Sequence, residues 1–270
     1  MTWRAVARKD FADAVRSRSL WTVAGIFVVA SVAAALVYAL VALQSSASSD
    51  SIVQLAGLLH LIAGVLVPVT ALLTGYRAIV GERESGSIKL LLSLPHERRN
   101  VVVGKLVGRS LVVAVAIAAG FGIATLVAAM FSPASLPIFL GFTAATVLFA
   151  VAFVAIAVGL SAASGSARRA ATGAFGAFVL FDLVWQRIPG LYTALAGARP
   201  PAWVFFLQRL SPNGAYSGVF TLFEGTGSIR ATLGGPVPVY LSWWVAALVL
   251  VAWVVLPTWV GYRRFAAADL

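Results

Sequence analysis

Residues 77–109 read RAIVGERESGSIKLLLSLPHERRNVVVGKLVGR, and this stretch decides how the chain folds. It carries seven Lys and Arg residues and three Glu residues, whereas the chain on either side of it is strongly apolar. A charged segment between two long apolar runs is typical of a polar loop outside a membrane. We therefore expect a hub on which a second protein acts, with the flanking apolar helices moving in response.

The composition places the whole chain in a membrane. Of 270 residues, 61% are hydrophobic and 11% are charged, and the mean hydropathy is +0.96. Soluble domains carry about 25% charged residues. The net charge of +11 would indicate nucleic acid binding in a soluble protein, but here the basic residues adjoin apolar runs and mark cytoplasmic faces. The chain has no cysteine, which excludes disulfides and thiolate chemistry.

The apolar runs predict an all-α integral membrane protein that forms a single domain over residues 1–270. Six transmembrane helices are expected, at about 20–43, 52–76, 110–130, 137–160, 171–185 and 239–262. All but the short fifth run reach the ~20 residues that a bilayer requires. Residues 2–19 alternate apolar and basic positions at helical spacing, which favours an interfacial helix over a solvated tail.

Residues 186–238 are too often interrupted by proline to form a span. We expect short interfacial or re-entrant helices there, with an exposed loop as the alternative. Ser211 followed by Pro212 is a typical helix start, and the helix would run to Phe223.

The distribution of Lys and Arg predicts the orientation. Sixteen of them fall on the side that holds both termini and the 77–109 loop, and four fall on the other side. Both termini are therefore expected in the cytoplasm of a multi-pass plasma-membrane protein. An even number of spans requires the same arrangement.

No catalytic, nucleotide or metal site is expected in this chain. Gly81 and Gly86 have phosphate-loop spacing, but Ser87-Ile88 follows where a lysine and a hydroxyl residue are needed. The two histidines are His60 and His96, and His60 has no evident nucleophile partner. Two histidines without cysteine predict no metal site.

The hub itself has features that suit a protein partner. Ile88, Leu91 and Leu92 are spaced i, i+3, i+4, an apolar stripe that could insert into a groove on a partner. A plain solvated loop fits this spacing equally well. We expect the helix of the second span to continue over 77–84, and we expect Gly104-x-x-x-Gly108 to pack closely on a neighbouring helix.

Two titratable residues lie within the predicted spans, Asp182 and His60. Ionisable side chains at membrane depth are costly, so we consider both as candidates for lining a transport pathway. Thr70, Thr74 and Tyr76 could line the inner mouth of the pathway or hydrogen-bond to neighbouring helices, and we expect the hydrogen bonds.

The motif E-R-E-S-G-S-x-K-L-L-L-S-L-P-x-x-R-x-x-V-x-x-G-K at 82–105 resembles the loop between spans two and three of type-2 ABC transporter permeases, the ABC-2 family. R-K-D-F-x-D-A-V-R-S-R-S at 8–19 is similar to the first helix of that family. L-S-P-N-G-A-Y at 210–216 resembles its far-side segment. The similarity covers essentially the whole chain and is greatest to the NosY-like branch, which serves nitrous-oxide reductase maturation.

The resemblance implies a permease subunit whose ATP hydrolysis takes place in a separate ABC ATPase subunit, which would also bind the ATP and Mg²⁺. A second permease chain, identical or related, would complete the pathway. The coupling helix would include Glu82, Glu84, Ser85, Gly86, Ile88, Leu91 and Leu92. The substrate would be an exported small molecule or a species linked to copper-enzyme maturation. The alternative is a non-transporting scaffold, in which 186–238 passes ATPase-driven motion to an extracytoplasmic partner.

Overall fold

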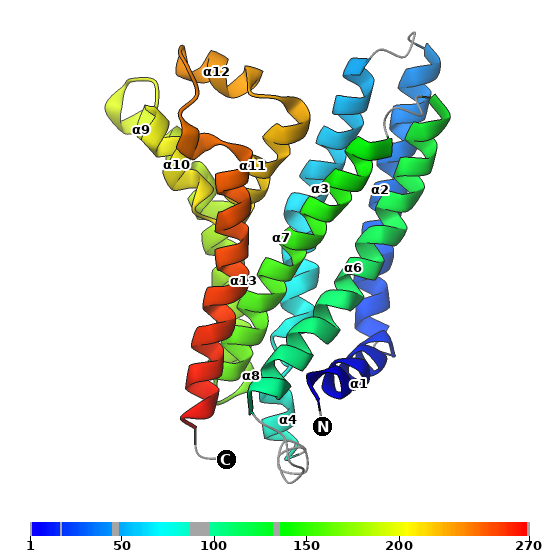
Figure 1. Ribbon diagram of the computed structural model, residues 1–270, viewed down its shortest axis with the longest axis vertical. Coiled ribbons are helices and arrows are strands. Elements are labelled where there is room, and N and C mark those ends of the chain that lie inside the picture. Colours follow the sequence, from blue (N-terminus) through cyan, green and yellow to red (C-terminus); the bar gives the residue numbers. More distant parts are fainter. Residues whose placement is uncertain (1, 17, 45–48, 87–97, 132–135, 269–270) are drawn as a thin grey trace.

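The computed structural model describes residues 2–16, 18–44, 49–86, 98–131 and 136–268, and every regular element within them is a helix (Figure 1). The longer helices are α1 (Trp3–Val15), α2 (Arg18–Gln44), α3 (Ser49–Gly75), α6 (Arg98–Phe131), α7 (Leu136–Ala163), α8 (Ala167–Phe178) and α13 (Trp243–Ala266). The shorter ones are α4 (Val80–Glu84), the π-helix η2 (Val179–Val184), η3 (Trp185–Arg187), α9 (Ile188–Ala196), α10 (Ala202–Arg209), α11 (Pro212–Glu224), α12 (Gly227–Leu233) and η4 (Val239–Leu241).

Four stretches are long and apolar enough to cross a membrane, judged by length and composition: Leu55–Glu84, Arg98–Met130, Leu136–Ala163 and Trp243–Ala266. The first of them comprises most of α3, a turn at 76–79 and α4. The four stretches correspond to predicted spans two, three, four and six. Helix α2 covers predicted span one, and α8 with η2 covers predicted span five. The all-helical membrane class is thus confirmed, while the total of six spans stays a prediction.

Helix α7 is the centre of the bundle. Its residues from Phe149 to Val158 are almost all buried, and α13, α6 and α3 pack against it. The crossing with α13 places backbone on backbone, since a Cβ built on Gly261 would lie 2.6 Å from Gly159 Cα. Glycines allow this approach because they have no side chain to separate the two helices.

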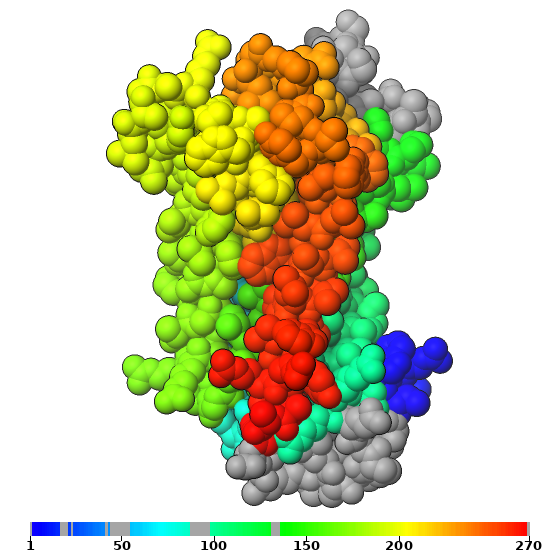
Figure 2. Space-filling model, turned by 60° about the vertical axis from the view of Figure 1, so that its left-hand side comes forward, coloured from blue at the N-terminus to red at the C-terminus, as the bar shows by residue number. Residues whose placement is uncertain are grey.

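The two ends of the bundle differ. Both chain termini lie at one end, together with α4 and with α1, which runs across the bundle rather than along it (Figure 1). The opposite end carries α9 to α12. Figure 2 shows α13 along the front of the molecule, α9 and α10 above α8, and α1 projecting sideways near the termini.

The predicted close packing by Gly104 and Gly108 is confirmed, and the neighbouring helix is α1. A Cβ at Gly104 would lie 2.6 Å from Val6 Cβ, and one at Gly108 would lie 2.9 Å from the Ala7 carbonyl oxygen. The two glycines therefore seat the N-terminal helix directly on the first turns of α6.

The far-side segment forms short helices as predicted. Helix α11 begins at Pro212, and the Ser211 hydroxyl accepts a hydrogen bond from Gly214 N at 3.1 Å. This is the expected N-cap, and the helix ends at Glu224, before Gly225.

The expected continuous helix over 77–84 is wrong, because the chain turns between Tyr76 and Ile79 before α4 begins. The N–H groups of Ile79 and Val80 donate to Ser161 Oγ, each at 3.0 Å, instead of to carbonyl groups four residues earlier. One hydroxyl on α7 therefore replaces two helical hydrogen bonds and redirects the chain.

Candidate functional site

Helix α4 is a short helix that is held from several sides at the termini end of the bundle. Ile79, Val80 and Ser161 are fully buried, so the hydroxyl of Ser161 satisfies two backbone donors that water does not reach. The start of α4 is thereby fixed to the last turn of α7.

A buried ion cluster joins α4 to α1 and α6. Lys105 Nζ lies 2.8 Å from Glu82 Oε1 and 3.1 Å from Asp10 Oδ1, and Arg109 Nε lies 2.7 Å from Asp10 Oδ2. The side chains of Lys105 and Asp10 are only 3% and 4% exposed. Buried charges are tolerated when they are paired and become costly when a partner is lost. The cluster therefore ties the three helices into one unit.

Glu84 connects α4 to α8. Its Oε1 atom accepts a hydrogen bond of 2.7 Å from the backbone N–H of Ala167, the first residue of α8. The Ser166 hydroxyl accepts from Arg169 N at 3.4 Å in the same turn. A carboxylate at a helix N-terminus is stabilised by the free N–H groups and by the helix dipole. Displacement of α4 would thus pull directly on the first turn of α8.

Arg83 and Arg98 hold the end of α13 next to α4. Arg83 Nη1 donates to the Ser164 carbonyl at 3.1 Å, and both guanidinium groups lie over the Phe265 ring, at 5.4 and 5.7 Å. Arg98 Nη1 also lies 2.8 Å from the carbonyl oxygens of Phe265, Ala266 and Ala268. Both guanidinium groups stay charged at any physiological pH.

The sequence-predicted coupling residues fall into two groups. Glu82 and Glu84 contact other helices as described, while Ser85 and Gly86 are exposed at the end of α4, where Gly86 has a φ of +74°. The predicted stripe of Ile88, Leu91 and Leu92 lies outside the described residues. The role of all seven in coupling stays a prediction.

Asp182 belongs to η2, the π-helix that continues α8. The Asn213 side-chain amide donates to Asp182 Oδ1 at 2.7 Å and to the Gly64 carbonyl of α3 at 3.2 Å. Asn213 thereby bridges η2, α3 and the first turn of α11. Wide π turns inside longer helices occur frequently at functional sites.

His60 of α3 contacts the same helix, α11. Its ring stacks between Tyr216 and Phe220, with centroids 4.6 and 4.5 Å away, and its Nε2 lies 3.2 Å from Ser217 Oγ. His60 thus has a hydroxyl partner that the sequence did not reveal. Its buried Nδ1 has no hydrogen-bond partner among the described residues, so the pair lacks the orienting group of a catalytic triad.

A cavity of about 550 Å³ opens beside His60 and is also lined by Ser217 and Glu224. Burial raises the pKa of the Glu224 carboxyl. Since Asn213 and Ser217 are one turn apart on α11, the two predicted pathway residues, Asp182 and His60, face neighbouring positions of one helix.

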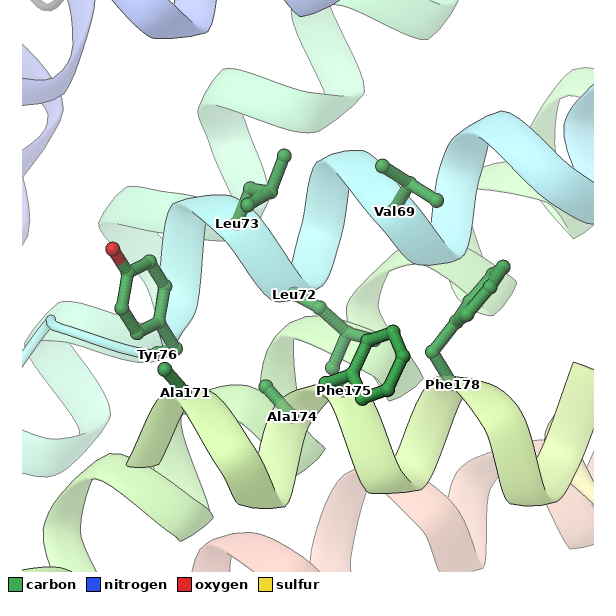
Figure 3. Close-up of a pocket in the computed structure, with 8 residues that line it drawn as sticks. All are labelled: Val69, Leu72, Leu73, Tyr76, Ala171, Ala174, Phe175 and Phe178. Atoms are coloured by element: carbon green, nitrogen blue, oxygen red, sulfur yellow. The ribbon is translucent and has the colours of Figure 1, made fainter. Parts of the chain in front are cut away.

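An apolar groove of about 370 Å³ runs between α3 and α8 (Figure 3). Its lining comprises Val69, Leu72, Leu73, Tyr76, Ala171, Ala174, Phe175 and Phe178. Phe175 is 69% exposed, so the groove is open at this residue, whereas Ala174 beside it is buried. The groove lies between the α8 turn held by Glu84 and the π-helix that carries Asp182.

The expectation that Thr70 and Thr74 hydrogen-bond to neighbouring helices is wrong. Their hydroxyl groups donate instead to the carbonyl oxygens of Leu66 and Ala71, which belong to the same helix, α3.

Sequence comparison identifies the family to which this architecture belongs. The family model described as ABC-2 family transporter protein matches residues 4–270. The chain is 33% identical over 273 residues to a probable ABC transporter permease protein NosY of Stutzerimonas stutzeri, covering 96% of each chain. It is 32% identical over 262 residues to the protein of the same name from Pseudomonas aeruginosa, covering 95% of this chain and 92% of the relative. The helical bundle described above is therefore a member of the ABC-2 family of transporter permeases, and it is similar to NosY permeases over nearly its whole length.

Proposed function

We propose that this chain is the membrane subunit of an ATP-driven exporter and that a separate ABC ATPase docks at the end of the bundle that carries α4. That subunit would bind ATP and Mg²⁺. The observation that carries the proposal is the contact of Glu84 with the first N–H of α8, because it links the docking end to a helix that borders an open groove.

The described contacts supply two routes for transmitting force from α4. One runs from Glu84 to α8, and the other runs from Glu82 through Lys105 to Asp10 of α1. A docked ATPase that shifts α4 would move α8 and α1 together. Helix α7 has many more buried residues than α8 and would serve as the fixed element.

The proposed pathway follows α3, α8 and η2 toward α11. Asp182 and His60 would supply polar side chains to a pathway whose walls are otherwise apolar. Polar residues within a membrane commonly line such pathways. The groove between α3 and α8 is open on one side, so a second permease chain, identical or related, would close it. Both termini would lie in the cytoplasm, in keeping with the excess of Lys and Arg on their side.

The test compares three forms of the chain co-expressed with its candidate ATPase: wild type, Glu84→Ala and Arg77→Gln. Arg77 lies 4.0 Å from Glu84 in an exposed pair, and such pairs contribute little, so it is the matched control. We expect all three forms to bind the ATPase. Wild type and Arg77→Gln should also change the rate at which the ATPase hydrolyses ATP, whereas Glu84→Ala should leave that rate unchanged. Failure of wild type to bind any ATPase in mild detergent would overturn the proposal.

The non-transporting scaffold is the second candidate, and one surface favours it. Leu191, Leu195 and Trp203 on α9 and α10 are all exposed at the end opposite α4. That apolar surface could bind an extracytoplasmic partner. Substitution of these three residues by serine should abolish partner binding and leave ATPase coupling intact if the scaffold role holds. A substrate linked to copper-enzyme maturation stays a proposal that rests on family resemblance.

A further inference from the structure

A second apolar groove, of about 300 Å³, lies at the termini end, where α1 crosses α2 and α6. Its lining includes Phe11 and Val15 from α1, Trp21 and Gly25 from α2, and Val112 and Ala116 from α6. Apart from the Trp21 indole, none of these six side chains is polar. A groove of this composition accommodates hydrocarbon and gives no partner to a polar ligand.

Two basic residues lie on the same side of α1 as the residues that line this groove. Arg4 and Arg8 precede Phe11 and Val15 at spacings of four, three and four, so all four share one side of the helix. Both arginines are exposed, and neither forms an ion pair with another described residue. Arg4 lies over the Trp3 ring at 5.5 Å.

The acidic residues of α1 do not cancel this charge. Asp10 is buried and paired with Lys105 and Arg109, and Asp13 lies on a different side of the helix from Arg8. The groove is also preformed, because Gly104 and Gly108 seat α1 on α6. The groove is therefore bordered by a side of α1 that also carries the exposed Arg4 and Arg8, on a helix that crosses the end of the bundle (Figure 1).

We propose that this groove binds one acyl chain of an anionic phospholipid, with the headgroup phosphate held by Arg4 and Arg8. Guanidinium groups bind phosphate oxygens strongly, and tryptophans such as Trp3 and Trp21 favour the level of lipid headgroups. The lipid would be a resident structural ligand. It would hold α1 in place, and α1 contacts the cluster that includes Glu82 of α4.

Gly25 offers a position at which a larger side chain can be introduced into the groove. A Cβ at Gly25 meets nothing within 4 Å, and the same holds for Gly122 of α6, which does not line the groove. Gly25→Phe therefore blocks the groove, and Gly122→Phe is the matched control. For the headgroup, Arg4→Gln with Arg8→Gln removes the charge, and Lys9→Gln on another face of α1 is its control.

The measurement is lipid binding by native mass spectrometry of the purified full chain, titrated with phosphatidylglycerol or with phosphatidylcholine of the same acyl chains. Wild type, Gly122→Phe and Lys9→Gln should hold one phosphatidylglycerol in preference to phosphatidylcholine. The double arginine variant should lose that preference, by about fivefold for each guanidinium, and Gly25→Phe should bind neither lipid at this site.

Two outcomes would overturn the inference. Equal binding of phosphatidylglycerol and phosphatidylcholine by wild type would show that Arg4 and Arg8 do not select an anionic headgroup. Unchanged lipid binding by Gly25→Phe, with a change in oligomeric state, would show that a second copy of the chain covers this groove instead.

Discussion

Glu84 Oε1 accepts a 2.7 Å hydrogen bond from the backbone N–H of Ala167, so a carboxylate from the charged hub completes the first turn of α8. The two residues are 83 positions apart in the chain. This contact links the end of α4 to the first turn of α8, whereas the start of α4 is bonded to Ser161 of α7.

We expect Glu84→Gln to keep part of this link and Glu84→Ala to lose it. The amide oxygen of glutamine can still accept the Ala167 N–H, but its missing charge weakens the interaction with the helix dipole. Loss of a capping group costs about 1 kcal/mol, so both variants should fold. Stimulation of the ATPase in the reconstituted complex should fall in the order wild type, Gln, Ala. Equal stimulation by all three would exclude a coupling role for this contact.

Asp10→Ala should destabilise the chain far more than Asp13→Ala. Asp10 is buried against Lys105 and Arg109, and its loss leaves Arg109 without that carboxylate and Lys105 with only Glu82. Breaking a buried pair costs about 3–5 kcal/mol, whereas an exposed charge contributes little. Thermal unfolding in detergent measures the difference. Similar melting temperatures for the two variants would show that the cluster does not hold α1.

Gly104→Ala should loosen the contact between α1 and α6. The new Cβ would lie 2.6 Å from Val6 Cβ and 2.8 Å from the Trp3 carbonyl oxygen, so one helix must shift. Gly122→Ala on the same helix meets nothing within 4 Å and should be neutral or stabilising by up to ~1 kcal/mol. Size-exclusion profiles after a heating series compare the two. A neutral Gly104→Ala would contradict the close packing.

Asp182→Asn should remove the ionisable carboxyl group from the π-helix and keep the hydrogen bond to Asn213. The asparagine carbonyl can still accept the hydrogen bond from Asn213, so the fold and melting temperature should be unchanged. We expect the variant to complement a deletion strain poorly, because asparagine cannot take up or release a proton as the carboxyl group of Asp182 can. Full complementation at wild-type expression would remove Asp182 from the proposed pathway.

Reporter fusions test the orientation of the last span, α13, and of the far-side segment before it. Green fluorescent protein fused after Leu270 should fluoresce, and alkaline phosphatase inserted between Gly234 and Gly235 should be active. The first reporter works in the cytoplasm and the second outside it. Activity of alkaline phosphatase at Leu270 would contradict an even number of spans with cytoplasmic termini.

The sequence was sufficient for features whose cause is local. The helix start at Ser211-Pro212 depends on neighbouring residues and was predicted correctly. The small-residue spacing of Gly104 and Gly108 indicated close packing, although the partner helix could not be named.

The rest depends on residues that are distant in the chain. No local pattern indicates that Ser161 interrupts the helix before α4, or that Asn213 and Ser217 of α11 contact Asp182 and His60. Asp10 is a similar case, because an aspartate on a basic helix resembles a surface residue. Its burial depends on the contact with Lys105, which lies 95 positions away in the chain and which no local pattern predicts.

The contact of Gly159 with Gly261 restricts how this sequence can diverge. Neither position can gain even a methyl group unless the backbone of the opposite helix retreats, so a change at one site cannot be rescued by a change of side chain at the other. Each must therefore stay glycine for as long as the crossing exists. Gly57 and Gly176 have open surroundings and can be replaced by larger residues without a clash. Among homologues, the former pair should be nearly invariant and the latter two variable.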